Sequence, residues 1–112
     1  AASPFICRDP RFPDMMDRDL SRTTVQSFLR SIASLRRTDL RPMLNDIKIP
    51  VMGMYGDKDN IVHPLQWKPL SAGVTKNKIE RFPKAGHFIM MDDPEPFMQK
   101  LKLFLDEELP TV

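Results

Sequence analysis

The sequence predicts an α/β fold with two parallel strands, a crossover helix between them, a C-terminal helix and an N-terminal helix. First, the apolar run IPVMGMY before Gly56 is too short for a helix and is typical of a strand buried on both faces. Second, another short strand, Lys78–Phe82, follows a helical segment that begins at Pro64, and this order predicts a right-handed crossover with parallel strands. Third, a stretch near each end of the chain repeats apolar residues at helical spacing.

The N-terminal third is predicted to be irregular at first and then helical. Residues 1–16 contain three prolines and no clear periodicity, so we expect extended or irregular chain there. A helix is expected from Asp19 to Arg37, with Ser21 or Asp19 as its N-cap. Its apolar face consists of Val25, Phe28, Leu29, Ile32 and Leu35.

The remaining elements follow from turn and capping residues. A short helical turn is expected from Asp39, ahead of the first strand. Pro64 suits the first turn of the crossover helix, which residues 71–73 (Ser-Ala-Gly) would end. Asp93 is the expected cap of the last helix and Pro94 its first residue. The apolar face of that helix is Phe97, Met98, Leu101, Phe104 and Leu105, and Leu109-Pro110 closes it.

Composition limits the classes of function. The 112 residues are enough for one domain, and 41% hydrophobic with 29% charged residues is typical of a soluble globular protein. A net charge of +2 is too small to indicate nucleic-acid binding, and no apolar run approaches the roughly 20 residues that cross a bilayer. The lone Cys7 cannot form an internal disulfide, so export to an oxidising compartment is not required. We expect a cytoplasmic protein with no nucleic-acid partner, no membrane partner and no cofactor.

Candidate site residues follow the two strands. Asp57 and Asp59 come directly after the first strand, and His87 lies in the turn after the second. Because carboxyl ends of parallel strands share one edge of a sheet, an acid and a histidine there can act as an orienting carboxylate and a base. Taken alone, GDKD is more typical of a plain polar turn than of a catalytic site. We interpret His63 as structural or pocket-lining, and two histidines without supporting ligands do not predict a zinc site.

Two motifs resemble the C-terminal third of the α/β-hydrolase superfamily. The segment IPVMGMYGDKDNIVHP is similar to the family's acid strand and turn, and KIERFPKAGHFIMMDDPEPFMQKLKLFL is similar to its histidine strand, histidine turn and final helix. The resemblance covers residues 39–109 and implies a partial α/β-hydrolase fold. It implies that Asp59 is the catalytic acid, with Asp57 as the alternative, and that His87 is the general base. We therefore predict that Asp59, and not Asp57, faces Nδ1 of His87.

The sequence departs from this family in one large respect. The family's nucleophile lies in a GxSxG turn ahead of the acid, and no such motif occurs here. Ser71, Cys7 and Ser3 all lack the glycine arrangement of that turn. By the same resemblance, residues 1–38 correspond to a lid or cap remnant and residues 39–112 to the C-terminal part of the hydrolase core. We therefore expect a fragment that supplies the acid and the base only.

The resemblance implies a parent hydrolase that acts on a small-molecule ester, amide or related bond through a nucleophile-His-Asp triad. This chain alone is expected to be inactive because it lacks the nucleophile. The alternative is a non-catalytic binding or association module derived from the same fold. Since two strands leave an unpaired edge and the helices carry apolar faces, we also expect a homo-oligomer or association with the missing N-terminal portion.

Overall fold

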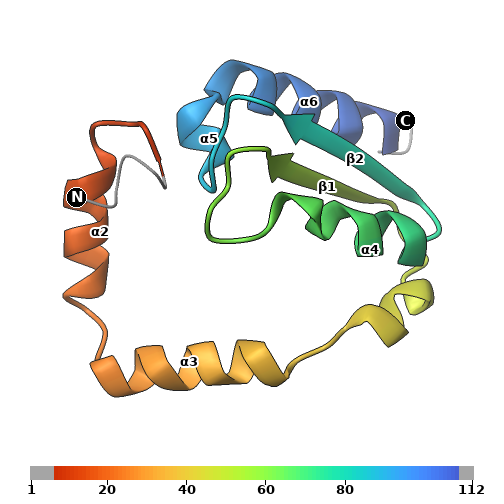
Figure 1. Ribbon diagram of the computed structural model, residues 1–112. Coiled ribbons are helices and arrows are strands. Elements are labelled where there is room, and N and C mark those ends of the chain that lie inside the picture. The colour runs from red at the N-terminus through yellow and green to blue at the C-terminus, as the bar shows by residue number, and fades with distance from the viewer. Residues whose placement is uncertain (1–6, 109–112) are drawn as a thin grey trace.

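The computed structural model describes residues 7–108, which form a two-stranded parallel sheet flanked by helices (Figure 1). Strand β1 (Val51–Gly56) pairs with strand β2 (Asn77–Phe82) in parallel, in register along the full length of both. Helices η2 (Pro64–Gln66) and α4 (Trp67–Gly73) connect the strands. The predicted order of strand, helix and strand, with the two strands parallel, is confirmed.

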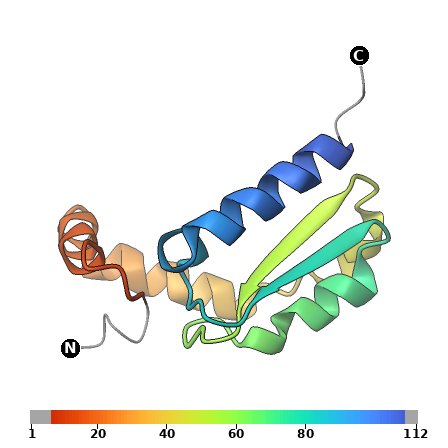
Figure 2. The same cartoon turned by 90° about the horizontal axis from the view of Figure 1, so that it is seen from above.

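Helices cover both faces of the sheet. Helix α4 lies on one face and α6 (Pro94–Glu108) lies on the other (Figure 2). The core cluster on the α6 side consists of the buried residues Phe82, Ala85 and Ile89, with Met54 and Phe97 packed against it. Pro94 begins α6 as predicted, whereas the predicted end at Leu109-Pro110 lies outside the described residues.

The N-terminal third differs from the prediction. Helix α2 (Phe12–Leu20) includes residues 12–16, which were expected to be irregular, because its proline lies in the first turn where no backbone donor is needed. The expected single helix from Asp19 to Arg37 is also wrong, because the chain breaks before helix α3 (Val25–Arg37). Thr24 caps α3 in place of Asp19 or Ser21: its hydroxyl accepts from the Ser27 N–H at 3.1 Å, while the Ser27 hydroxyl accepts from the Thr24 N–H.

Helix α3 stands away from the sheet (Figure 1). None of its residues is buried, and its apolar side chains are exposed, from 40% for Ile32 to 76% for Val25. The short helix η1 (Arg41–Asp46) then returns the chain to α4, where Leu44 packs against Gly73. No helix within residues 7–108 combines the length and the hydropathy of a membrane-crossing segment.

Candidate functional site

The turn after β1, residues 57–60, is held in place by main-chain hydrogen bonds to the end of β2 and beyond. The Asp57 N–H donates to the Phe82 carbonyl at 3.0 Å, and the Lys58 N–H donates to the Ala85 carbonyl at 3.0 Å. The Asp59 N–H donates back to the Gly56 carbonyl at 3.1 Å, which closes the turn. We name these residues the acid turn. These main-chain hydrogen bonds hold its backbone without a contribution from any side chain.

The loop after β2, residues 83–88, crosses directly over the end of β1. Gly56 is required there, because a Cβ atom at this position would collide with the Gly86 carbonyl oxygen and lie 2.5 Å from that of Ala85. Ala85 and Gly86 are both buried, whereas His87 is partly exposed. We name this segment the histidine loop.

The acid turn and the histidine loop bring Asp59 and His87 together. Oδ2 of Asp59 lies 2.9 Å from Nδ1 of His87, and the side chains are 12% and 33% exposed. Oδ1 of Asp59 accepts hydrogen bonds from the N–H groups of Ile61 at 2.8 Å and Val62 at 2.9 Å. The predicted contact is therefore present, although a catalytic role for either residue stays a prediction.

The surroundings of Asp59 keep its carboxyl group ionised. Burial alone would raise its pKa. This effect is outweighed by the hydrogen bonds from Val62, His87 and Ile61 and by the charge of His87, so the pKa lies below its usual value. An ionised carboxylate can only accept hydrogen bonds, so Nδ1 of His87 must be the donor. The neutral imidazole then has its lone pair on Nε2.

The alternative acid, Asp57, points elsewhere. Its Oδ1 accepts a hydrogen bond from Nε of Arg81 on β2 at 3.0 Å, in an ion pair whose side chains are 29% and 47% exposed. Such partly exposed pairs contribute little to stability. The structure therefore separates the two acids of GDKD into one that meets the histidine and one that forms a surface ion pair.

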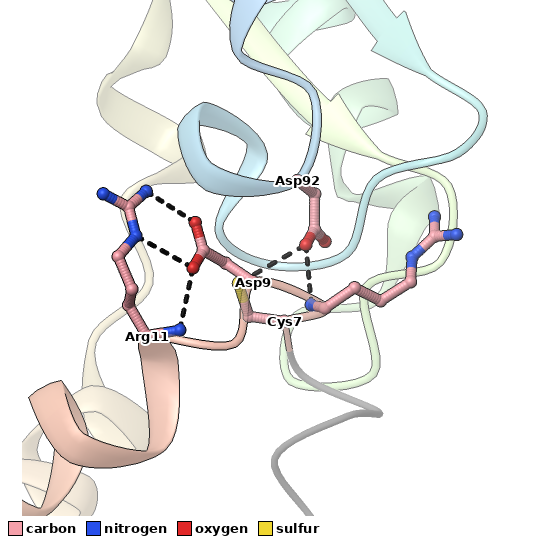
Figure 3. Close-up of polar contacts among 5 residues, drawn as sticks. Cys7, Asp9, Arg11 and Asp92 are labelled. Carbon is pink, nitrogen blue, oxygen red and sulfur yellow. Dashed lines mark hydrogen bonds and ion pairs between the residues drawn. The ribbon is translucent and has the colours of Figure 1, made fainter.

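Asp92 is a further site residue that the sequence analysis missed. It ends the one-turn helix α5 (Ile89–Asp92), which was also not predicted. Its Oδ2 accepts from the Gly86 N–H at 2.8 Å. Its Oδ1 accepts from the Arg8 N–H at 2.7 Å and the Cys7 thiol at 3.3 Å (Figure 3). The sequence offered one weak signal for this role: Asp92 is one of two adjacent aspartates ahead of the last helix, five positions after His87.

The other polar candidates have structural surroundings. Nδ1 of His63 accepts from the Leu65 N–H at 3.1 Å and so caps η2, which agrees with the structural interpretation. Cys7 is buried, and this burial raises the pKa of its thiol, as does the bonded Asp92. Ser71 lies within α4, and Ser3 lies outside the described residues.

Two further features lie away from the Asp59–His87 pair or do not form a site. A cavity of about 220 Å³ opens at the amino ends of the strands, where it is lined by Val51, Asn77 and Phe104 among others. Among residues 7–108, no group of three or more His, Cys, Asp or Glu side chains is placed to hold a metal ion.

Comparison with known families identifies the fold. Residues 8–94 match the family described as the alpha/beta hydrolase fold, which is more than half of the chain. A search of curated proteins found no match.

Solved structures of similar fold include three enzymes. An esterase (EaEST) from Exiguobacterium antarcticum is 26% identical with a TM-score of 0.65, over 69% of this chain and 29% of that one. MGS-MChE2, an alpha/beta hydrolase enzyme from a sediment metagenome of the Mar Chica lagoon in Morocco, is 22% identical with a TM-score of 0.71, over 88% of this chain and 45% of that one. MGS-M2, an alpha/beta hydrolase enzyme from a Medee basin deep-sea metagenome library, is 21% identical with a TM-score of 0.71, over 97% and 44%. This chain therefore spans less than half the length of these structures.

Proposed function

This chain belongs to the alpha/beta hydrolase fold family, and from that premise we propose that it supplies the acid and the base of a nucleophile-His-Asp triad. In this proposal His87 is the general base and Asp59 orients its ring and stabilises the imidazolium. The observation that carries it is the 2.9 Å contact between Asp59 Oδ2 and His87 Nδ1. The parent reaction is hydrolysis of a small ester, amide or related bond.

The geometry supports this division of roles. Because two main-chain donors fix Oδ1 of Asp59, only Oδ2 is directed at His87, and the ring is held in one orientation. Nδ1 is engaged with the carboxylate, so Nε2 is the nitrogen that accepts a proton from a nucleophile. The esterase similarity agrees with hydrolysis but leaves the substrate open.

The proposal extends to the remainder of the chain. Residues 1–38 act as a lid or cap remnant and residues 39–112 as the C-terminal part of the core. The nucleophile comes from a GxSxG segment that is not in this chain, because no such motif occurs in its sequence. The small-molecule substrate then binds only when that segment is present. We propose a cytoplasmic location for the parent enzyme.

Imidazole ¹⁵N spectra of the 112-residue chain test the pair directly. In the unmodified chain we expect the neutral His87 ring to carry its proton on Nδ1. In Asp59→Asn the amide oxygen must face the Ile61 and Val62 N–H groups, so the amide NH₂ faces Nδ1 and the proton moves to Nε2. Asp57→Asn is the matched control and leaves the proton on Nδ1. A ring that responds to neither substitution contradicts the proposed pair.

Turnover of short p-nitrophenyl esters separates the enzyme from a non-catalytic binding or association module. The chain alone is expected to show none, because loss of the nucleophile typically removes roughly 10⁶ in rate. Fused or mixed with a GxSxG-containing portion of the same fold, it should gain activity that Asp59→Asn lowers by about 10⁴. If the complemented protein is active and His87→Gln leaves that activity unchanged, this chain contributes association only, and the non-catalytic module is favoured.

A further inference from the structure

The peptide bond between Ala85 and Gly86, immediately ahead of His87, is held at both of its polar ends. Its carbonyl accepts the Lys58 N–H from the acid turn at 3.0 Å, and its N–H donates to Oδ2 of Asp92 at 2.8 Å. Both residues of this peptide are buried, so water does not replace a lost partner freely. The orientation of this peptide affects the position of the His87 backbone, and with it the point from which the imidazole side chain extends.

Asp92 closes the histidine loop into a short ring. The side-chain bond from Asp92 to Gly86 joins two positions six apart in the sequence, and His87 is the first residue between them. Within this ring, the Asp92 N–H donates to the Phe88 carbonyl at 3.0 Å, a main-chain bond of the one-turn helix α5 that ends at Asp92. The histidine loop and Asp92 therefore position each other: the carboxylate binds the Gly86 N–H, and the backbone of Asp92 is bonded to Phe88.

The second oxygen of Asp92 connects this ring to the N-terminal strap, by which we mean residues 7–12. Oδ1 accepts the Arg8 N–H and the Cys7 thiol, and the buried Phe12 packs on Phe88 with ring centroids 4.9 Å apart. Phe88 in turn meets the His87 ring edge to face at 5.1 Å. Within the strap, an ion pair between Asp9 and Arg11 at 2.7 Å orders the turn that leads into α2 (Figure 3).

We infer that Asp92 is a positioning residue for His87, acting through the Gly86 N–H, and that it also anchors the N-terminal strap over the histidine loop. This inference rests on the proposed role of His87 as a base. Asp92 does not touch His87, and its effect on the ring passes through the backbone of the loop. The two oxygens have separate tasks: Oδ2 sets the loop and Oδ1 holds the strap.

The two tasks can be separated by substitution. Asp92→Ala removes both acceptors. Asp92→Asn keeps one oxygen acceptor, and its place follows from burial: the Gly86 N–H is buried, whereas Arg8 is exposed and can donate to water. We therefore expect the amide oxygen of the Asp92→Asn variant to face Gly86. Asp93→Asn alters the neighbouring carboxylate and is the control.

The test measures amide exchange at Gly86 and the imidazole ¹⁵N signature of His87 in the 112-residue chain. For Asp92→Ala we expect exchange of the Gly86 amide to rise at least about tenfold, and the Nδ1-protonated ring to give way to a mixture of tautomers. Asp92→Asn should restore both readings while the Cys7 thiol becomes more reactive to a disulfide reagent. Asp93→Asn should match the unmodified chain. If Asp92 contributed to stability alone, Asp92→Ala would lower the melting temperature and leave the tautomer of His87 unchanged.

Two outcomes would overturn the inference. One is an unchanged Gly86 amide and an unchanged ring in a folded Asp92→Ala. If that variant does not fold, the unmodified chain decides, since a through-hydrogen-bond coupling from the Gly86 amide to the Asp92 carboxyl carbon must be present, and its absence overturns the inference. Failure of the proposed function is distinct: there the ring ignores Asp59→Asn, while the Gly86 amide still exchanges faster in Asp92→Ala.

Discussion

The backbone N–H of Lys58 donates to the carbonyl of Ala85 at 3.0 Å, and this bond joins the acid turn to the histidine loop through main chain alone. The approach of Asp59 to His87 therefore does not depend on the bond between their side chains. Substitutions at Asp59 are accordingly expected to change the chemistry of the pair while the two segments stay docked.

The first prediction concerns Gly56, where β1 passes under the histidine loop. We expect Gly56→Ala to lower the free energy of unfolding by about 3 kcal/mol, since its new Cβ meets backbone carbonyls that cannot rotate away. Gly53→Ala in the same strand is the control, and its loss should be smaller because the atoms met there include the side-chain ends of Tyr55 and Leu70. Urea melts of both variants measure the difference. Equal losses would contradict the close approach.

The second prediction concerns pH. The pKa of Asp59 is lowered in the folded chain, so its ionised form contributes stability above the unfolded-state pKa of roughly 3.9, and that contribution is lost as the pH falls through the folded pKa. The difference in unfolding free energy between the unmodified chain and Asp59→Asn should therefore be largest above about pH 4 and shrink toward acid. Urea melts between pH 7 and pH 2 provide the values. A difference that stays constant over this range would show that the charge of Asp59 is not coupled to folding.

The third prediction concerns the N-terminal strap. Phe12 is 1% exposed and Cys7 is 3% exposed, so we expect Phe12→Ala to open the strap and to speed labelling of Cys7 by a disulfide reagent at least about tenfold. The expected cost of such a truncation in a packed site, about 3 kcal/mol, is more than enough for that factor. Leu20→Ala, at an exposed position of α2, is the control and should leave the labelling rate unchanged. Equal rates in all three proteins would mean that Cys7 is exposed by a motion that does not involve Phe12.

The fourth prediction concerns association. Helix α3 presents an apolar face in which Phe28 is 50% and Leu35 is 69% exposed, and we propose that this face contributes to a homo-oligomer or to association with the missing N-terminal portion. Sedimentation should show concentration-dependent association of the chain. The double substitution Phe28→Gln with Leu35→Gln should shift it toward the monomer, whereas Arg30→Gln with Arg37→Gln on the opposite side should not. A chain that is monomeric at all concentrations would contradict this proposal.

Local patterns were sufficient for the strands. The apolar run of β1 and the Pro64 start of the crossover are both read within a few residues, and the structure agrees with each. The preference for Asp59 over Asp57 as the partner of His87 came from the family resemblance, and the contact that it predicted is present. Element boundaries in the N-terminal third were wrong where several capping residues compete. Asp19, Ser21 and Thr24 can all cap a helix, and only Thr24 has Ser27 three positions later to reciprocate.

Asp92 shows what such patterns cannot reach. Its partners Cys7 and Arg8 lie 85 and 84 residues away in the chain, and neither periodicity nor capping rules connect positions at that distance. Its bond to Gly86 is nearer but depends on α5, a single turn too short to produce a periodic signal. The site was therefore predictable as a pair and not as the set of contacts that holds the pair.

These separations along the chain also have a consequence for the order of folding. Asp59 and His87 are 28 residues apart and belong to one crossover unit, whereas the contact between Cys7 and Asp92 closes a segment of 85 residues. For a flexible chain the longer closure costs about 1 kcal/mol more in entropy, and the exposed helix α3 between the two regions offers no intermediate docking point to reduce it. We therefore expect the histidine and its carboxylate to assemble early, in the fast kinetic phase of the crossover, and the N-terminal segment to lock onto the finished loop last.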